Sequence, residues 1–353
     1  MMNDEAVRSF LIEEDDARLN MTTSGNVRLR ALAVSLLAAS IAINTWFLLK
    51  FSSANLGHCP PRLNQTLLDA PLPAAKSARP GKLADGCYHV FIDAGSNIGM
   101  HARFLLEPNN YKQAWISRKF FTSVYGPEQL RDARDFCIFA FEPNPSHMKR
   151  QLDLKKSYYE MGWRYHFIPA GLSDKKTRLT FYQVDDQLGY SAVPKAECRR
   201  DRSKCPPTHI VPSYRLSDWI EEEVSGRILP PHAFGGKGYV TGPRVSIKLD
   251  VEMLEWLVIP DLLASGVLCR DVDALMGEFH QQWHLYPVTF ENINKDGSNW
   301  TLHNATEAEG FAKELVGMVN RNTNCKTKLD MRDDESYISD GFPLPGEAVG
   351  NKV

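Results

Sequence analysis

The sequence lacks three features, and each absence excludes a class of protein or of site. Its seven cysteines include no Cys-x-x-Cys pair, so the sequence indicates no zinc site. The formal net charge is -2 at pH 7, and without an excess of basic residues we expect no nucleic-acid partner. No internal repeat occurs, so a repeat architecture is not expected. The length of 353 residues, 43% of them hydrophobic, allows one large domain with appendages or two small domains.

One continuous apolar segment, Ala31–Leu49, contains no charged residue. As a helix it would be about 28 Å long, close to the ~30 Å hydrocarbon core of a bilayer. We therefore predict a transmembrane signal-anchor helix over these residues, preceded by a cytosolic tail over residues 1–30. A buried helix of a soluble protein is one alternative, and a cleaved signal peptide is the other.

The flanking charges predict the orientation of this helix. Arg28 and Arg30 precede it and Lys50 follows it, which favours a cytosolic N-terminus and a lumenal domain. The chain would then be a type II single-pass membrane protein of the endoplasmic reticulum or Golgi. Three glycosylation sequons fit lumenal exposure, and they begin at Asn64, Asn299 and Asn304.

Residues 50–86 are rich in Pro, Ala and Ser, which predicts a stem between the membrane helix and the large domain. Cys59 and Cys87 bracket this stem and could pair in an oxidising lumen. Cys198 and Cys205 enclose a short segment and could form a local disulfide.

The predicted globular domain, 87–345, is organised around the stretch Tyr88–His101, and residues 346–353 are expected to be loose. Val90–Ile92 is a short apolar run that predicts a buried parallel strand. The turn after this strand contains four candidate cofactor-binding residues, Asp93, Gly95, Asn97 and Gly99. The glycines permit a tight turn and close packing of the next helix. A carboxylate beside such a turn suits a nucleoside cofactor that carries positive charge and no pyrophosphate, such as S-adenosyl-L-methionine.

Two later strands add candidates for cofactor binding. The strand Phe136–Phe141 ends at Glu142, the position at which doubly wound folds bind the ribose hydroxyls of a nucleoside. An insertion over 108–135 separates Glu142 from the glycine-rich turn by more than the usual ~20 residues. After a third strand, 165–169, Asp174 either accepts a hydrogen bond from an adenine amino group or caps a turn. We also predict helices over 100–107, 146–161 and 305–320, a strand over 179–183, and a closing strand and turn over 334–345.

Four acid–base residues follow two further strands and are the catalytic candidates. Asp250 and Glu252 come where a strand meets a helix, at the sheet edge that binds ligands in such folds. Glu278 and His280 are two residues apart at the end of the next strand, so their side chains project on one face. Structural polar groups are the alternative for any one of them, but four such groups at two strand ends favour a functional site.

The expected roles of these four residues follow from their chemistry. His280 has the ordinary pKa best suited to a general base, about 6.5, and Glu278 would orient it or bind substrate. Asp250 and Glu252 would position an acceptor diol, or instead hold a divalent cation such as Mg²⁺, which no sequence feature demands.

The glycine-rich turn and three later segments, Glu142–Pro145, Lys248–Glu252 and Glu278–His280, occur in the order of the motifs of a known family. Together they resemble the FkbM family of S-adenosylmethionine-dependent methyltransferases over residues 88–285. The resemblance implies an α/β fold with a doubly wound, mostly parallel, Rossmann-like sheet and an antiparallel strand at its C-terminal edge. It also implies O-methyl transfer to sugars or small hydroxylated molecules.

The resemblance assigns roles to particular residues. It implies that the four turn residues and Glu142 hold the cofactor. It aligns Asp250, Glu252 and Glu255 with the family's Asp-x-Glu-Gly-x-Glu run, in which Met253 stands in place of the usual glycine.

We therefore predict a membrane-anchored, lumenal, S-adenosylmethionine-dependent methyltransferase that O-methylates a glycan or small molecule. One alternative is a catalytically silent binding protein on a methyltransferase scaffold, and Met253 is the residue that favours it. A second alternative, an NAD-dependent oxidoreductase, is disfavoured because the turn lacks the full Gly-x-Gly-x-x-Gly pattern.

Overall fold

The computed structural model describes residues 81–183, 190–192, 209–235, 242–280, 286–290, 300–332 and 340–346. The predicted cytosolic tail, membrane helix and most of the stem lie outside these residues. All described residues fall within one compact unit, Pro60–Val353. Within this described part of the chain, no helix is both long enough and apolar enough to cross a membrane.

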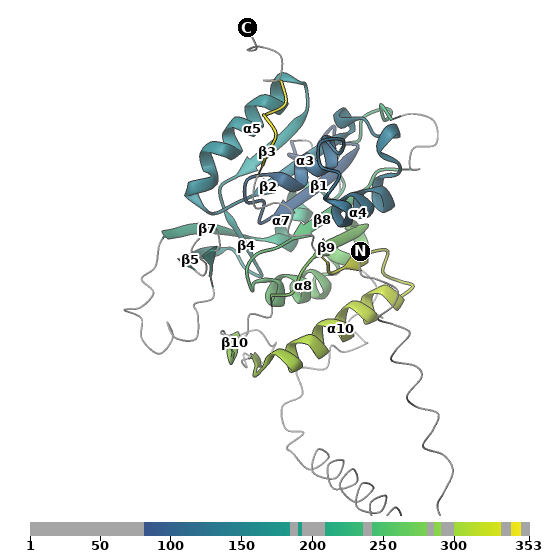
Figure 1. Cartoon of the computed structure of the whole chain (residues 1–353). Helices are drawn as coiled ribbons and strands as arrows, with labels where there is room; N and C mark the ends of the chain where they lie inside the picture. The colour runs from purple at the N-terminus through teal and green to yellow at the C-terminus, as the bar shows by residue number, and fades with distance from the viewer. Residues whose placement is uncertain are drawn as a thin grey trace, which may run out of the picture. The chain divides into compact units, whose positions relative to one another are not determined.

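A six-stranded, all-parallel sheet forms the centre of the molecule (Figure 1). Its strands are, in spatial order, β12 (Lys328–Asp330), β9 (Ala274–Gly277), β8 (Val245–Leu249), β1 (His89–Ala94), β2 (Phe136–Phe141) and β3 (Arg164–Ile168). The chain builds β1, β2 and β3 outward in one direction and then returns to place β8, β9 and β12 on the other side of β1. This is the strand order of a Rossmann-like fold, and the reversal between β1 and β8 is its topological switch point.

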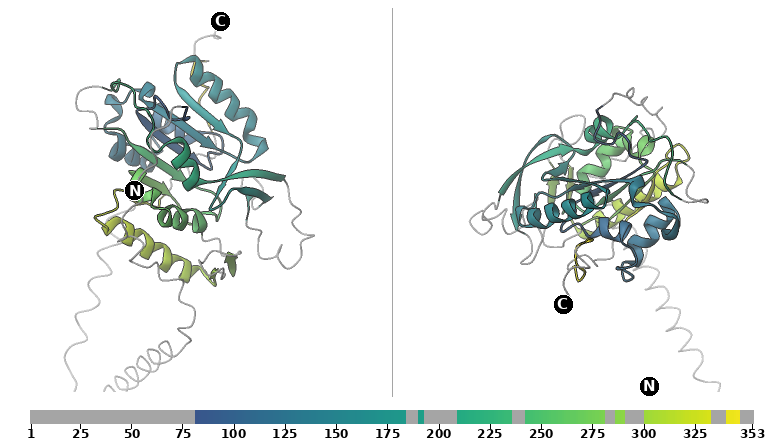
Figure 2. Two further views of the ribbon diagram at one scale, coloured as in Figure 1. Left: turned by 180° about the vertical axis from the view of Figure 1, so that it is seen from behind. Right: turned by 90° about the horizontal axis from the view of Figure 1, so that it is seen from above.

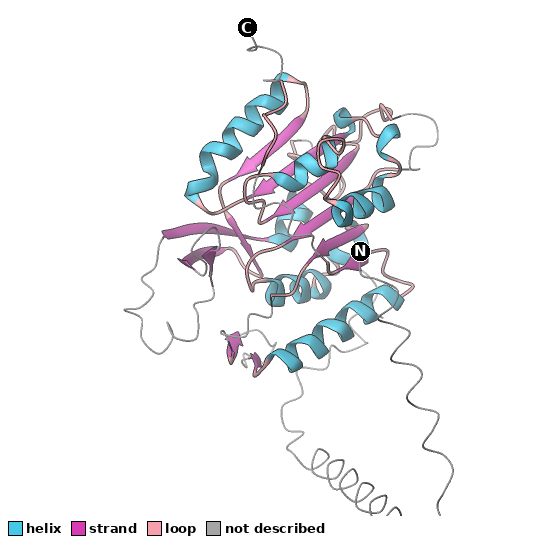
Figure 3. Cartoon of the chain, viewed as in Figure 1, coloured by secondary structure: helices cyan, strands magenta, loops and turns pink. Residues whose placement is uncertain are grey.

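Helices cover both faces of this sheet, as Figure 2 shows from behind and from above. The helices α3 (Met100–Leu106), α4 (Trp115–Tyr125) and α5 (Met148–Glu160) pack on one face, and α7 (Leu216–Glu223), α8 (Glu255–Ala264), α9 (Val267–Asp271) and α10 (Ala305–Arg321) pack on the other. The smaller elements are the sheet of β4 (Gly171–Ser173), β7 (His209–Arg215), β5 (Thr177–Gln183) and β6 (Tyr190–Ser191), the pair β10 (Val288–Phe290) and β11 (Trp300–Leu302), and the short helices η2 (Glu128–Leu130), η3 (Ala133–Asp135) and η4 (Pro145–His147) (Figure 3).

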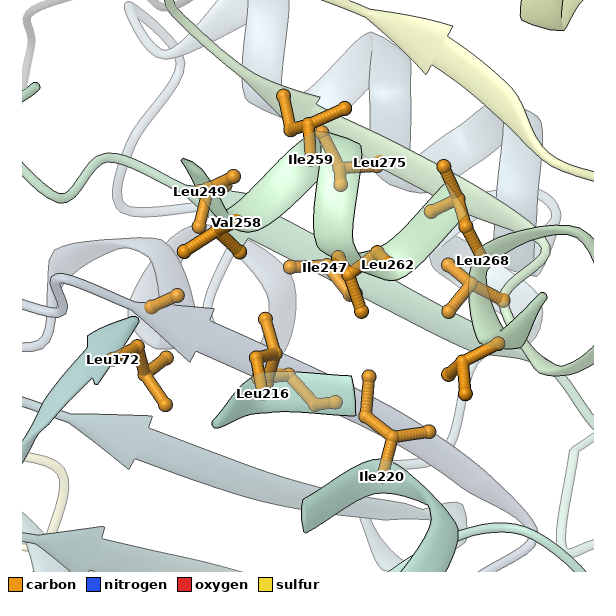
Figure 4. Close-up of a cluster of buried hydrophobic side chains, with 14 of the residues drawn as sticks. Leu172, Leu216, Ile220, Ile247, Leu249, Val258, Ile259, Leu262, Leu268 and Leu275 are labelled. Atoms are coloured by element: carbon orange, nitrogen blue, oxygen red, sulfur yellow. The ribbon is translucent and has the colours of Figure 1, made fainter. Parts of the chain in front are cut away.

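The central strands β1, β2 and β8 are buried at every position, and most of their residues are apolar. In β1, Val90 and Ile92 join the core beneath α7 and α8, whereas Phe91 between them joins the core beneath α3 and α4. Figure 4 shows Ile247 and Leu249 of β8 lying against the apolar side chains of α8. Side chains alternate between the two faces of a strand, so a run of apolar residues without alternation indicates a sheet covered on both sides.

The predicted strands at β1, β2, β3, β5, β8 and β9 and the predicted helices at α3, α5 and α10 are confirmed. The antiparallel edge strand implied by the family resemblance is wrong, because the edge strand β12 pairs in parallel with β9. The closing strand predicted over 334–345 lies partly outside the described residues, and its described part, 340–345, contains no strand. The predicted insertion over 108–135 is not a plain loop, since it contains α4.

Two disulfides occur among the described residues, Cys87–Cys137 and Cys269–Cys325. The predicted pairing of Cys87 with Cys59 is therefore wrong. The parallel pairing of β1 with β2 sets Val90 beside Cys137, which brings the start of β1 within reach of that cysteine. Cys198 and Cys205 lie outside the described residues.

Candidate functional site

The carboxyl ends of β1 and β8 meet at the switch point, and the contact between them requires a glycine. Gly95 has a φ of 78°, and a Cβ atom on it would lie 1.7 Å from the backbone oxygen of Asp250. The backbone N–H of Asp250 donates to the Ala94 carbonyl at 3.0 Å. Lys248 ties the two strand ends together, because its Nζ donates to the Gly95 carbonyl at 3.1 Å and to Asp250 Oδ2 at 2.8 Å.

The glycine-rich turn continues from this contact into α3. Asn97 and Gly99 both have a left-handed backbone, with φ angles of 49° and 84°. A Cβ atom on Gly99 would lie 2.5 Å from Leu154 Cδ2 of α5, so the buried Leu154 side chain would have to shift to admit it. The Gln151 side chain of α5 holds the turn from the other side, since its Nε2 donates to the Asn97 carbonyl at 2.7 Å.

Glu142 lies directly against this turn. Its Oε2 accepts a hydrogen bond from the backbone N–H of Asn97 at 2.7 Å, and its Oε1 accepts one from the N–H of Asn144 at 2.8 Å. The long insertion does not displace Glu142, because β1 and β2 are neighbours in the sheet and their carboxyl ends lie at the same edge. A carboxylate oxygen has a second lone pair, so Glu142 retains acceptor capacity for a ligand.

Asp93 and Asp174 occupy different surroundings. Asp93 is fully buried in β1, in register with Ala140 and Lys248 on the two neighbouring strands. Burial raises the pKa of Tyr165 well above its usual value of 10, and the charge of the Asp93 carboxylate adds to this rise. Asp174 follows β4 of the smaller sheet and accepts a hydrogen bond from Ser173 Oγ at 2.8 Å. An adenine contact for Asp174 stays a prediction.

The four predicted catalytic residues converge around one imidazole ring. His280 Nε2 lies 3.1 Å from Glu278 Oε1, 3.4 Å from Glu252 Oε2 and 3.6 Å from Asp250 Oδ1. The loops that follow β8 and β9 supply these groups, and the two strands are neighbours in the sheet. We call Asp250, Glu252, Glu255, Glu278 and His280 the carboxylate–histidine cluster.

Glu255 is the member of the cluster that was not among the four predicted catalytic residues. It is the first residue of α8 and fully buried, and its Oε1 lies 3.0 Å from His280 Nδ1. The same oxygen accepts the backbone N–H of Val251 at 2.7 Å. The available sequence signal was the acidic residue at the helix start within the run that resembles the FkbM motif.

The cluster changes the proton affinity of its members. Burial raises the pKa of Glu252 to about 7, against the opposing charge of His280 and with the help of the neighbouring carboxylates. Burial alone would lower the pKa of His280, but Glu255, Glu278 and Glu252 raise it well above 6.5. These carboxylates therefore favour the protonated form of the His280 ring. The role of His280 as a general base stays a prediction, now for a ring whose pKa is raised.

The loop between β8 and α8 has a left-handed backbone, which glycine adopts most easily, although it contains no glycine. Glu252 and Met253 have φ angles of 50° and 83°, and Met253 is buried. A left-handed conformation costs about 1–2 kcal/mol for a residue with a side chain. Burial of a methionine side chain contributes a stabilisation of about the same size. Met253 therefore does not prevent the turn that the family's usual glycine would form.

A search of solved structures finds similarity to the crystal structure of methyltransferase FkbM from Methylobacillus flagellatus KT. The identity is 10% and the TM-score is 0.29, and the match covers 65% of this chain and 37% of that one. No family model matches the sequence, and no curated protein matches it. The function is therefore inferred from the site itself.

Proposed function

We propose that this chain is an S-adenosylmethionine-dependent methyltransferase that acts on a hydroxyl group of a glycan or small molecule. One observation carries the proposal. At the β1/β8 switch point the glycine-rich turn lies between Glu142, which binds its backbone, and Asp250, which belongs to the carboxylate–histidine cluster. In Rossmann-like folds, ligands bind at this point of the sheet edge.

The residues of the turn fit a cationic nucleoside. Asn97 Oδ1 is buried and accepts no hydrogen bond from any described residue, so it is available to the amino group of S-adenosylmethionine. Glu142 would hold the ribose hydroxyls, and Asp93 would favour the positive charge of the cofactor. A pyrophosphate in the same place would lie close to these carboxylates, and like charges at such distances repel. The bound cofactor would supply an activated methyl group.

The chain's own residues would bind and orient the acceptor. Glu252 and Glu278 are the more exposed members of the cluster, with side chains 28% and 30% exposed, so the acceptor approaches from their side. Their carboxylates would accept hydrogen bonds from its hydroxyl groups. Transfer of a methyl group is an in-line displacement, for which correct positioning of the two reactants supplies much of the rate.

Calorimetric titration tests the cofactor. We expect the wild-type chain to bind S-adenosylmethionine and not NAD, and Asp93→Asn, which removes one negative charge at constant shape, to lose measurable binding. Asp153→Asn is the matched control, because Asp153 lies on the exposed side of α5 and pairs with Lys149. Binding of NAD in preference to S-adenosylmethionine would contradict the proposed function. Equal affinity of the wild type and Asp93→Asn for S-adenosylmethionine would mean that Asp93 takes no part in cofactor binding.

We also propose that the large domain is lumenal and anchored by Ala31–Leu49. The two disulfides support this proposal, since disulfides persist in oxidising compartments and are rare in the cytosol. Asn304 supports it as well. It is an exposed residue at the start of α10, and its Oδ1 accepts the Glu307 N–H, which leaves its Nδ2 available for a glycan.

Glycosidase treatment tests this location. We expect an endoglycosidase to increase the gel mobility of the chain expressed in a eukaryotic host, and Asn304→Gln to reduce that shift. The large domain should also resist protease in sealed microsomes until detergent is added. An unchanged mobility together with protease sensitivity in sealed microsomes would place the domain in the cytosol.

A further inference from the structure

The carboxylate–histidine cluster concentrates negative charge in a largely enclosed place. Four carboxylates surround His280, whereas Lys248 pairs with Asp250 on the side that faces the glycine-rich turn. The side chains of Asp250 and His280 are only 10% and 9% exposed. Even with one proton on each His280 nitrogen, carboxylates outnumber the cationic groups among these residues. Buried carboxylates in excess are stabilised by a bound cation.

Three members of the cluster have the spacing of a metal site. Asp250, Glu255 and His280 each present an oxygen or nitrogen atom, and these atoms lie within 4.8 Å of one another. Three carboxylate oxygens lie 3.1, 3.4 and 3.6 Å from His280 Nε2. Bonds of roughly 2.2 Å that meet at right angles put neighbouring ligand atoms roughly 3.1 Å apart, which is close to the distance of each of these oxygens from Nε2.

Glu255 orients the ring for this role. A carboxylate only accepts hydrogen bonds, so the 3.0 Å contact requires His280 Nδ1 to carry a proton, which makes Nε2 the ligand nitrogen. Metal-binding histidines in proteins are held in this way by a carboxylate on the other nitrogen. The second oxygen of this fully buried carboxylate, Glu255 Oε2, accepts no hydrogen bond from the described residues.

We propose that Asp250, Glu252, Glu278 and His280 Nε2 bind one divalent metal cation, with Glu255 as the buried carboxylate that positions His280. The donor set points to Mn²⁺. Carboxylate oxygens suit Mg²⁺, Ca²⁺ and Mn²⁺, and an imidazole nitrogen among them favours the transition metal. The cation would lower the pKa of an acceptor hydroxyl, a step that rests on the proposed function, whereas the cation site itself does not.

Binding of Mn²⁺ to the full-length chain, stripped of metal by a chelator and without S-adenosylmethionine, tests the site. We expect calorimetry and the loss of the free Mn²⁺ electron paramagnetic resonance signal to report one saturable site per chain. Mg²⁺ should compete only at higher concentration. Glu278→Gln should weaken Mn²⁺ binding by at least about 10–100-fold. That is the loss typical when a residue that hydrogen-bonds to a metal ligand is replaced. The exposed Glu309→Gln on α10 is the matched control and should bind Mn²⁺ as the wild type does.

The outcomes separate the cation site from the methyltransferase proposal. No saturable Mn²⁺ binding by a wild-type chain that binds S-adenosylmethionine would overturn the cation site and leave the cofactor site standing. Equal Mn²⁺ affinity in the wild type and Glu278→Gln would overturn the placement in this cluster. Mn²⁺ binding that Glu278→Gln weakens, in a chain that fails to bind S-adenosylmethionine, would support the cation site and contradict the proposed function.

Discussion

Replacement of Gly95 by alanine is expected to lower the free energy of unfolding by roughly 3–5 kcal/mol and to abolish S-adenosylmethionine binding. The added Cβ would lie 1.7 Å from the backbone oxygen of Asp250, so β1 and β8 would have to separate at their carboxyl ends. The atoms nearest to this Cβ all belong to the backbone of Asp250 and Val251, so no flexible side chain could move aside to relieve the clash. The left-handed φ of 78° adds a conformational cost of its own.

Gly162→Ala is the matched control for this substitution. Gly162 has a φ of 75°, but a Cβ atom on it would meet no other atom within 4 Å. Gly162→Ala should therefore lower the free energy of unfolding only by the cost of the left-handed backbone, about 1–2 kcal/mol. Urea unfolding of the two variants measures the difference, and calorimetry measures cofactor binding. Equal losses of stability would contradict the close approach of Gly95 to Asp250.

Lys248→Met is expected to destabilise the fold by about 3–5 kcal/mol, because it leaves the Asp250 carboxylate without its nearest cation. The Lys248 side chain is 1% exposed, and its ammonium group lies 2.8 Å from Asp250 Oδ2. The same ammonium group donates to the Gly95 carbonyl, so the variant also loosens the contact between the two strand ends. Cofactor affinity should fall together with stability.

A double-mutant cycle identifies the cause of this loss. Asp250→Asn in the Lys248→Met background removes the uncompensated charge, so the double variant should lose less stability than the sum of the two single losses. Lys149→Met on α5 is the control, since Lys149 is 88% exposed in its pair with Asp153 and should change stability by no more than about 1 kcal/mol. Unfolding is measured with chelator present. Additive single losses would mean that Lys248 acts through packing and not through its charge.

The secondary structure near the site could be predicted from the sequence because its signals are local. An uninterrupted apolar run ending in an acidic residue predicted β1 with Asp93 and β2 with Glu142, and strands that end at Asp250 and Glu278 were predicted at β8 and β9. Parallel strands bring their carboxyl ends to one edge of a sheet, so the meeting of the predicted residues at that edge could also be expected.

The pairing partners could not be predicted, because they depend on segments that are distant in the chain. The antiparallel edge strand implied by the family resemblance was wrong. The three-residue strand β12 carries no signal for its orientation, and only its pairing with β9 decides it. The predicted disulfide partner of Cys87, Cys59, was wrong because the true partner is also distant in the chain. The register between β1 and β2 selects Cys137, and nothing in the spacing of the cysteines indicates it.

The sequence by itself determined which residues could take part in the chemistry and at which edge of the sheet they lie, because these depend on apolar runs and on the residues that end them. Only the tertiary structure decided the surroundings that raise the pKa of His280. Its ordinary pKa predicted a base, but Glu255 of α8 and the loops after β8 and β9 surround both ring nitrogens with carboxylates. A proton affinity is set by the charges within a few ångströms of a group in space, and those neighbours are known only once the strands have paired.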